Sequence, residues 1–235
     1  MDDELTQPAT QQILDPRRMG RNNSGLNDQD IADVLCILHP SSNAAIHVVE
    51  ETARTKPHYV LSRNPFNSFD DPANLDEQQT LIIGKQGIPM SNDLALRMSA
   101  PLHRPSLGFV FGRNQNLSDI TFGHDSGRRI SNQHFRIYLN DEGILMIEDM
   151  STNGTLVDEI LLKSKEPQYP RNRMLESGSI IRVAPAGEDA GGIKFIVRIP
   201  SHDGYREQYT ANLDAFFKRC VQDDKRKGKR PSSPL

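Results

Sequence analysis

Apolar and polar residues alternate most regularly in the second half of the chain, a pattern typical of β-strands with one buried face. This alternation predicts short strands over residues 109–111, 135–139, 144–147, 155–157, 179–183 and 193–199. The sequence Asn-Asp-Glu-Gly at residues 140–143 predicts a turn between the second and third of these strands. Many short strands with turns and almost no helix predict an all-β sandwich or barrel.

The first half of the chain is less regular. Residues 34–38, Val-Leu-Cys-Ile-Leu, are apolar on both faces and precede Pro40, as expected for a buried strand. Cys36 is expected to be a small core side chain rather than a reactive thiol. Residues 44–55 carry apolar side chains at helical spacing and stop before Pro57, which predicts a short helix. Further strands are predicted over residues 58–61, 80–83 and 94–98.

The two ends of the chain differ from its middle. Residues 1–29 are polar, rich in Gln, Asn and Asp, and lack a period of 2 or 3.6, which predicts a disordered tail. Residues 201–224 space their apolar side chains by three and four, which predicts a helix from about residue 204 that docks on the strands. Residues 225–235 form a basic tail that either is simply solvated or acts as a nuclear-import signal. The stripe of the predicted helix consists of Tyr205, Tyr209, Leu213, Phe216, Phe217, Cys220 and Val221.

Composition and charge exclude several classes of protein. The net charge is −3 over 235 residues, which argues against a dedicated nucleic-acid-binding protein. Hydrophobic residues make up 36% of the chain and Trp is absent, which fits one modest core plus disordered ends. No apolar run is long enough to span a membrane, and the acidic N-terminus lacks the features of a signal peptide. We therefore expect a soluble protein of a reducing intracellular compartment, nuclear or cytoplasmic.

Four polar clusters fall at the ends of predicted strands, where side chains from different loops can converge on a ligand. In chain order they are Gly112-Arg113, Ser118-Asp119, residues 129–135 (Arg-Ile-Ser-Asn-Gln-His-Phe) and residues 149–155 (Asp-Met-Ser-Thr-Asn-Gly-Thr). Each cluster alone is a weak signal, because a strand-end arginine is often just solvated and Asn-Gly is a good turn. A phosphate dianion requires donors and positive charge, and arginine supplies both through its planar fork.

In this order and spacing, the four clusters resemble the forkhead-associated (FHA) domain, a β-sandwich that binds phosphothreonine peptides. The resemblance is nearest to the N-terminal FHA region of fungal checkpoint-type serine/threonine kinases. It implies an FHA domain over residues 30–200, built as a sandwich of two antiparallel sheets with a short inserted helix and a C-terminal helix. Residues 41–107 are longer than a minimal FHA domain needs between its first strands, so they are expected to be an insertion.

The resemblance also implies roles for individual residues. Asn153 matches the position that binds the peptide backbone. Arg129 matches a position that reads the third residue after the phosphothreonine and favours an acid there. Gly112, His134 and Gly154 match positions that support the binding loops, and no neighbour of His134 completes a catalytic arrangement. The residues that match phosphate-binding positions are Arg113, Ser131, Asn132 and Thr152.

The sequence lacks the motifs of catalysis and of metal binding. It contains no Gly-rich phosphate loop after a strand, no Val-Ala-Ile-Lys, no His-Arg-Asp and no Asp-Phe-Gly. No Cys and His cluster has the spacing of a metal site. We therefore expect no catalytic residue, no metal or other cofactor, no enzyme activity, and neither nucleic acid nor membrane as a partner.

Three functions are compatible with the sequence. The first is a phosphothreonine-dependent adaptor that recruits phosphorylated proteins, in checkpoint or DNA-damage signalling. The second is the regulatory N-terminal part of an FHA-containing serine/threonine kinase whose catalytic portion lies outside this chain. The third is a sandwich that binds partners independently of phosphate, which predicts equal binding of phosphorylated and unphosphorylated peptides.

Two Thr-Gln pairs in the N-terminal tail, at Thr6 and Thr10, allow two interpretations. They fit a solvated Gln-rich tail, and they also fit sites for damage-response kinases, which prefer Ser or Thr before Gln. A phosphate there would add about −1.5 to −2 charge. The second interpretation predicts self-association, in which phosphorylated Thr6 or Thr10 of one copy binds the FHA site of another.

Overall fold

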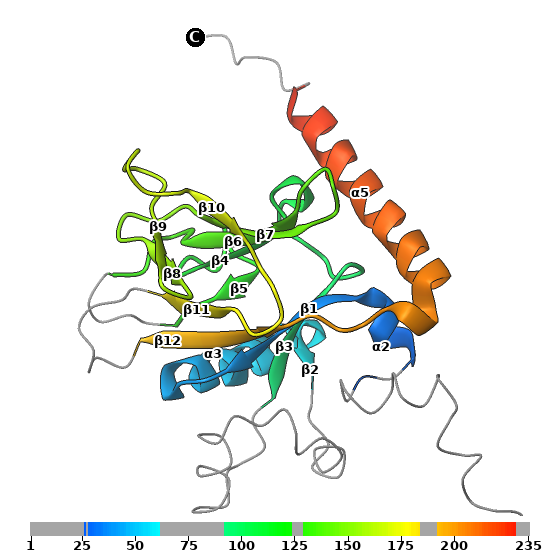
Figure 1. Cartoon of the computed structure of the whole chain (residues 1–235), viewed down its shortest axis with the longest axis horizontal. Coiled ribbons are helices and arrows are strands. Elements are labelled where there is room, and N and C mark those ends of the chain that lie inside the picture. The colour runs from blue at the N-terminus through cyan, green and yellow to red at the C-terminus, as the bar shows by residue number, and fades with distance from the viewer. Residues whose placement is uncertain (1–25, 27, 62–91, 124–128, 184–191, 229–235) are drawn as a thin grey trace, which may run out of the picture.

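Two β-sheets pack face to face, and a long helix, α5 (Arg206–Gly228), lies beside them (Figure 1). This arrangement comes from a computed structural model, which describes residues 26, 28–61, 92–123, 129–183 and 192–228. The expected strand at residues 80–83 lies outside the described residues, and so do Thr6, Thr10 and most of the basic tail. The chain is an all-β sandwich with few helices, which the strand pattern allows and the resemblance to the FHA domain implies.

The larger sheet has seven strands in the order β2-β3-β1-β12-β11-β8-β9, and each neighbouring pair is antiparallel. Its central pair places Leu38 opposite Val197, both completely buried. The alternation of Ile193, Phe195 and Val197 buries one face of the last strand, as expected from the sequence. The strands are β1 (Val34–Pro40), β2 (Val60–Leu61), β3 (Asp93–Arg97), β8 (Thr155–Val157), β9 (Ile160–Leu162), β11 (Ile180–Val183) and β12 (Ile193–Arg198).

The smaller sheet has five strands in the order β10-β7-β6-β4-β5. Three of its neighbouring pairs are antiparallel, but β4 and β5 run parallel, with Phe111 opposite Ile120. The predicted sandwich of two antiparallel sheets is thus confirmed, with one parallel pair at this edge, because the loop after β4 returns the chain in the same direction. The strands are β4 (Phe109–Gly112), β5 (Ile120–Thr121), β6 (Phe135–Leu139), β7 (Leu145–Asp149) and β10 (Asn172–Met174).

Aromatic rings form the centre of the core. Phe111 and Phe135 stack with ring centroids 4.5 Å apart, and Phe122 lies 6.0 Å from Phe111. Cys36 is buried in the same hydrophobic cluster, as predicted for a core side chain. Burial raises the pKa of the Cys36 thiol, so the thiol stays protonated and unreactive.

The predicted inserted helix is α3 (Asn43–Thr55), and it contacts strands of both sheets, namely β1, β12 and β5. The Ser42 hydroxyl caps it by accepting a hydrogen bond from Ala45 N at 3.2 Å. One face of the helix, with Val48 and Val49, is buried in the main core. At its C-terminal end, the Lys56 ammonium donates to the carbonyl oxygens of Ser118 and Asp119, which ties α3 to the loop before β5.

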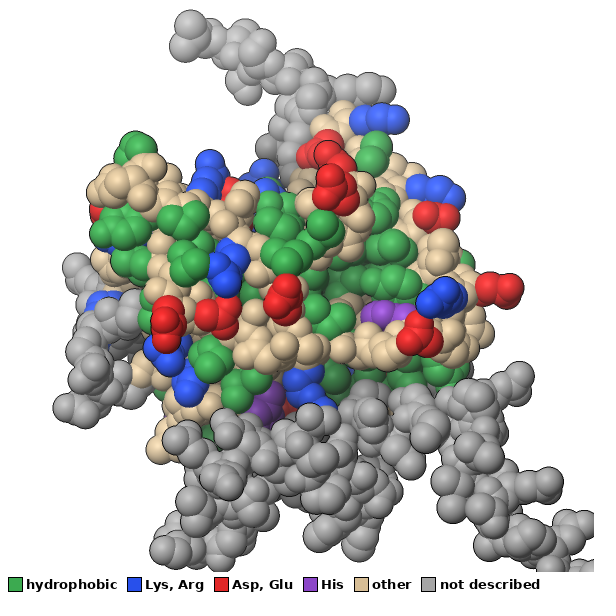
Figure 2. Space-filling view, in the orientation of Figure 1, with side chains coloured by type: hydrophobic (Ala, Val, Ile, Leu, Met, Phe, Trp, Pro, Cys, Tyr) green, Lys and Arg blue, Asp and Glu red, His purple; other side chains and the backbone are tan. Residues whose placement is uncertain are grey.

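The C-terminal helix α5 docks through the apolar stripe predicted from the sequence. Phe216 is 2% exposed and stacks on Phe109 of β4, with centroids 6.1 Å apart and ring planes at 9°. Tyr209 stacks on His202 with centroids 3.8 Å apart, and hydrophobic side chains gather between the sandwich and α5 (Figure 2). No helix in the described part of the chain is long and apolar enough to span a bilayer.

Two boundaries differ from the sequence expectation. The disordered tail was expected to reach residue 29, but Leu26 is buried and α2 (Asp28–Asp33) buries Ile31 and Ala32. These apolar positions are too few to form a recognisable period. The final helix continues to Gly228, so the first basic residues after residue 224 are helical.

Short elements account for the remaining differences. Residues 58–61 were expected to be one strand, but a 3₁₀ turn (Pro57–Tyr59) precedes the two-residue β2, because the fixed φ of Pro57 favours a tight turn. Two more such turns, Pro105–Leu107 and Asp203–Tyr205, precede β4 and α5. The strands β5, β9 and β10 were not predicted, since β5 has only two residues and neither Ile-Leu-Leu in β9 nor Asn-Arg-Met in β10 alternates apolar and polar side chains.

Candidate functional site

The register of the strands brings four loops to one end of the sandwich. Phe135 at the start of β6 lies opposite Phe111 near the end of β4 and opposite Asp149 at the end of β7. Six residues after Asp149, Thr155 starts β8 and lies opposite Leu162, the last residue of β9. The loops after β4, before β6, between β7 and β8 and after β9 therefore meet, and all nine predicted site residues lie in or next to them.

Gly112 lets the first two of these loops approach closely. The backbone N–H of Arg113 donates to Ser131 O at 3.0 Å, and that of Asn114 donates to Asn132 O at 3.2 Å. A β-carbon on Gly112 would lie 2.1 Å from Asn132 O and 2.8 Å from the hydroxyl oxygen of Ser118. Because a contact this short is sterically forbidden, only glycine permits this pairing without a shift of the backbone.

His134 connects three loops through its backbone and its ring. Its N–H donates to Phe111 O at 2.7 Å, and its carbonyl accepts from Met150 N at 2.8 Å. In the ring, Nδ1 accepts the backbone N–H of Ser131 at 3.1 Å, so the proton of the neutral ring is on Nε2. Nε2 lies 3.2 Å from Gly154 O and donates to it. The side chain is completely buried, so its contacts are structural.

Asp149 organises the loop between β7 and β8 from the inside. Its buried carboxylate accepts hydrogen bonds from the Ser151 hydroxyl at 2.7 Å, the Thr155 hydroxyl at 2.9 Å and the backbone N–H of Ser164 at 3.0 Å. The Ser151 hydroxyl oxygen in turn accepts from Gly154 N at 2.7 Å. Gly154 has a φ of 91°, a left-handed conformation that favours glycine. The loop is therefore fixed before any ligand binds.

Ser131 joins this loop to the one that follows β4. Its hydroxyl oxygen accepts the backbone N–H of Thr152 at 3.1 Å, while its carbonyl accepts from Arg113. The Ser131 hydroxyl keeps its own proton to donate. Beside it, the Asn153 amide donates to Arg129 O at 2.8 Å, and a carboxamide holds a second N–H and an acceptor oxygen beyond that bond.

The exposed side chains at this end are cationic or neutral. Arg113, Asn132, Thr152 and Asn153 are exposed, and Arg129 and Ser131 are half-buried. The Arg113 guanidinium makes no hydrogen bond to any residue in the described part of the chain, which leaves its planar fork directed to solvent. The structure thus brings every predicted phosphate-binding and peptide-binding residue to one surface.

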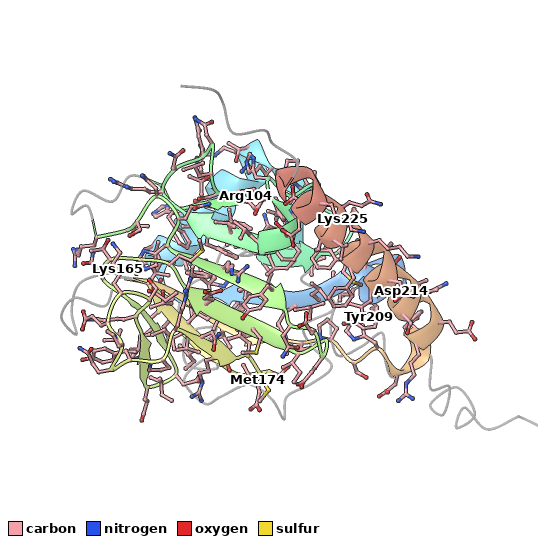
Figure 3. All side chains as sticks on the ribbon, turned by 90° about the horizontal axis from the view of Figure 1, so that it is seen from above. Arg104, Lys165, Met174, Tyr209, Asp214 and Lys225 are labelled. Carbon is pink, nitrogen blue, oxygen red and sulfur yellow. The ribbon has the colours of Figure 1, made fainter. Side chains whose placement is uncertain are left out.

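Lys165 belongs to the same surface but was not predicted from the sequence. Its ammonium donates to the Thr152 hydroxyl oxygen at 3.0 Å. It lies at the end of the molecule opposite Tyr209 and Lys225 of α5 (Figure 3). Thirteen residues separate Lys165 from Thr152, and only the folding of the loop after β9 brings them together. A lysine in the polar run Lys-Ser-Lys carries no sequence signal that distinguishes it from a solvated side chain.

Asp119 has a structural role at the other end of β4. Its carboxylate accepts the backbone N–H groups of His103 and Val110, each at 2.8 Å. Burial raises its pKa, while these two hydrogen bonds and the charge of Lys56 act against that increase. Among the described residues, no group of His, Cys, Asp or Glu side chains is arranged to hold a metal ion.

The fold and these contacts define a class of protein, a β-sandwich that presents cations, hydroxyls and carboxamides from preformed loops at one end. The family model of the FHA domain matches residues 109–184, a stretch that begins with β4 and includes every site residue named above. The chain therefore belongs to the FHA domain family.

Comparison with known proteins also found similar sequences and solved structures. The chain is 29% identical over 117 residues to the serine/threonine-protein kinase RAD53 of Saccharomyces cerevisiae, a match that covers 50% of this chain and 11% of that kinase. A structure of the N-terminal FHA domain of S. cerevisiae Rad53p with a phosphothreonine peptide is 30% identical, with coverage of 42% and 71% and a TM-score of 0.34. The solution structure of the yeast Rad53 FHA1 domain is 18% identical, with coverage of 86% and 96% and a TM-score of 0.40. The family assignment rests on the sequence matches.

Proposed function

We propose that this chain binds phosphothreonine peptides at the loop surface around Ser131. The observation that carries the proposal is the double attachment of Ser131, whose carbonyl accepts from Arg113 N and whose hydroxyl oxygen accepts from Thr152 N. These two bonds bring the backbones of Arg113, Ser131 and Thr152 together, which supports a site where one guanidinium and two hydroxyl groups share one rim. Fixed donors around a shared space are what a phosphate dianion requires.

Each side chain then has a defined task. The Arg113 fork donates paired hydrogen bonds to the phosphate oxygens, and the hydroxyls of Ser131 and Thr152 donate one bond each. Asn132, exposed beside Ser131, supplies a further amide donor. Asn153 binds the peptide backbone with the groups that remain after its bond to Arg129 O. Binding of this kind involves no chemical step, so the proposed activity is recognition rather than catalysis.

Titration calorimetry with one peptide in phosphothreonine, phosphoserine and unphosphorylated forms tests the proposal. Three or four charge-assisted bonds of roughly 1.5–3 kcal/mol each, less the costs of association, give micromolar affinity, about −8 kcal/mol. Arg113→Ala should cost about 2–5 kcal/mol and abolish measurable binding. Arg206→Ala is the matched control, since Arg206 is an exposed arginine on α5 whose partner is Asp203. Equal affinity of phosphorylated and unphosphorylated peptides would instead support a phosphate-independent interaction sandwich.

Arg129 is proposed to select the third residue after the phosphothreonine. Its carbonyl is held by Asn153, which fixes the backbone of Arg129 next to the residue proposed to bind the peptide main chain. Arg129→Glu should therefore change the third-position preference from acidic to basic more than it changes phosphate affinity. A peptide array with all residue types at that position measures this, and an unchanged profile would reject the assignment.

The setting we propose is phospho-dependent recruitment in checkpoint or DNA-damage signalling, in the nucleus or cytoplasm, as an adaptor. The chain is similar to a serine/threonine kinase, and the match covers 11% of that kinase. This similarity favours a second candidate, in which the chain is the regulatory FHA part of such a kinase. Both candidates share the phosphothreonine-binding activity. Sequencing of the transcript beyond the codon for Leu235 separates them.

Self-association is a further part of this proposal. Phosphorylated Thr6 or Thr10 of one copy would occupy the site of a second copy. Native mass spectrometry of the phosphorylated chain at tens of micromolar, beside an Arg113→Ala variant, tests it. Dimers that disappear with Arg113→Ala support the proposal, and strictly monomeric phosphorylated protein rejects it.

A further inference from the structure

Lys165 is the cation at the loop surface that neither the family resemblance nor the strand pattern singles out. Its ammonium donates to the Thr152 hydroxyl oxygen at 3.0 Å, and the side chain is exposed. Thr152 is one of the residues proposed to bind phosphate, so this contact lies within the proposed site rather than beside it.

The position of Lys165 is fixed through its neighbour in the chain. The backbone N–H of Ser164 donates to the buried Asp149 carboxylate at 3.0 Å, and the Ser164 hydroxyl donates to Ser151 O at 3.4 Å. The same carboxylate holds Ser151, directly before Thr152. One buried group therefore holds the residues directly before Lys165 and Thr152, which brings the two loops within reach of this contact.

The direction of this hydrogen bond determines what Thr152 can do. An ammonium group only donates, so the oxygen of Thr152 must be the acceptor. One lone pair of that oxygen is then occupied, and the hydroxyl proton turns away from Lys165. Among the described residues, the Thr152 hydroxyl donates to no acceptor, so its proton is left to donate to a group outside the protein. Lys165 thereby fixes the direction in which the Thr152 hydroxyl donates, and the positive charge of the Lys165 ammonium strengthens that hydrogen-bond donor.

We propose that Lys165 is a positioning residue for phosphate recognition, which orients the Thr152 hydroxyl toward the phosphate. This inference rests on the proposed phosphothreonine binding and adds a residue to it. Lys163, two positions earlier, offers a contrast. Its ammonium is paired with Glu166 at 2.7 Å and lies 5.0 Å from the Tyr169 ring centroid, so its charge is committed elsewhere.

A purely structural role for Lys165 makes a different prediction. If Lys165 only tied two loops together, its removal would lower stability. If instead its charge acted directly on the phosphate, its effect on binding would persist without the Thr152 hydroxyl. A positioning role requires that hydroxyl, so the effect of Lys165 on binding should largely disappear when Thr152 is replaced by valine. A double-mutant cycle distinguishes the two cases.

The experiment uses the full chain and one phosphothreonine peptide in titration calorimetry. The variants are Lys165→Met, Thr152→Val, the double variant, the rescue variant Lys165→Arg and the control Lys163→Met. Lys165→Met should weaken binding about 3- to 10-fold without change in melting temperature, because an exposed charged donor contributes modestly. Lys163→Met should stay within about twofold of the parent, as expected for a surface charge committed elsewhere. Lys165→Arg, which keeps a donor, should recover part of the loss.

The outcomes separate this inference from the function on which it rests. If the parent chain shows no preference for the phosphorylated peptide, the proposed function itself fails. If the parent prefers that peptide but Lys165→Met binds as tightly as the parent, the inference about Lys165 is overturned. It is also overturned if Lys165→Met and Thr152→Val weaken binding additively, since the lysine would then act without the hydroxyl.

Discussion

Gly112 shows how one residue controls the spacing of two loops. The missing side chain lets the carbonyl of Asn132 approach to a point 2.1 Å from where a β-carbon would lie. Gly112→Ala should therefore destabilise the fold by about 1–3 kcal/mol, as expected for forced overpacking. Because relief of the clash moves Ser131 and Asn132, the variant should also lose phosphopeptide affinity. Urea unfolding and calorimetry measure the two effects.

Gly123→Ala is the matched control for this substitution. No atom of the described residues lies within 4 Å of a β-carbon built at Gly123, so the change should leave both stability and affinity nearly unaltered. If Gly112→Ala behaved like Gly123→Ala, the close approach of the two loops would not constrain the site.

Most residues of the proposed site were predicted from the sequence, but the contacts that hold them in place were not. Gly112 and Arg113 were selected by resemblance to a family pattern, yet the contact with Asn132 that requires glycine spans twenty residues and becomes visible only in three dimensions. Lys165 was missed because its role depends on one hydrogen bond to Thr152 across two loops. A sequence shows which side-chain types lie at strand ends. It does not show which residue of another loop they bond to, because that depends on strand register and turn geometry.

At the scale of elements, the loop between β7 and β8 depends on one buried carboxylate. Asp149→Asn replaces an acceptor oxygen by an amide donor that faces the donors of Ser151, Thr155 and Ser164. We expect a loss of about 2–4 kcal/mol in unfolding free energy, because buried donors lose their acceptor. We also expect loss of phosphopeptide binding, since Thr152 and Asn153 belong to this loop.

Chemical unfolding followed by calorimetry checks this expectation. Asp214→Asn on the exposed side of α5 (Figure 3) is the control, and it should change neither quantity. Full stability in Asp149→Asn would mean that backbone bonds alone hold the loop.

The connection between β12 and α5 should respond to pH through His202. Burial lowers the pKa of this histidine below its usual 6.5, and its Nε2 donates to Val34 O at 3.1 Å. As pH falls below about 6.5, the unfolded chain takes up a proton at His202 before the folded chain does. His202 therefore makes stability fall with decreasing pH until its folded pKa is passed.

Urea unfolding at several pH values between 7 and 5 measures this slope. His202→Gln should flatten it, because glutamine does not titrate. His47→Gln is the control, since the His47 side chain is 79% exposed on α3. An equal slope in the parent and His202→Gln would assign the pH dependence to other groups.

Elements were predictable where burial imposes a period over at least four or five residues. The strands β1, β4, β6, β7 and β12 and the helices α3 and α5 all meet that condition. The two-residue strand β5 and the polar strand β10 do not, since they pair only because β4 and β7 present an edge to them. The parallel direction of β5 follows from the path of the loop after β4. The alternation of apolar and polar residues does not predict that path.

At the scale of the whole molecule, the proposed binding surface and the helix α5 lie at opposite ends of the sandwich. The proposed binding surface lies with Lys165 at one end, and α5 with Tyr209 and Lys225 lies at the other (Figure 3). Between them is the aromatic core, in which Phe109 of β4 contacts Phe216 of α5 and Phe111 of the same strand contacts Phe135. The strand β4 thus reaches from the helix contact to the arginine proposed to bind phosphate.

Phe216→Ala tests whether the two ends are coupled. Loss of a 2% exposed ring should cost about 3–5 kcal/mol and expose α5, which would show as faster amide hydrogen exchange along the helix. Effects at distant sites are usually independent, so affinity for the phosphothreonine peptide should change by less than about twofold under conditions in which the variant stays folded. Val221→Ala, at a position 51% exposed on the same helix, is the control for the substitution itself. If Phe216→Ala weakened peptide binding strongly, packing along β4 would connect the helix to the site, and the C-terminal helix would be part of the recognition machinery.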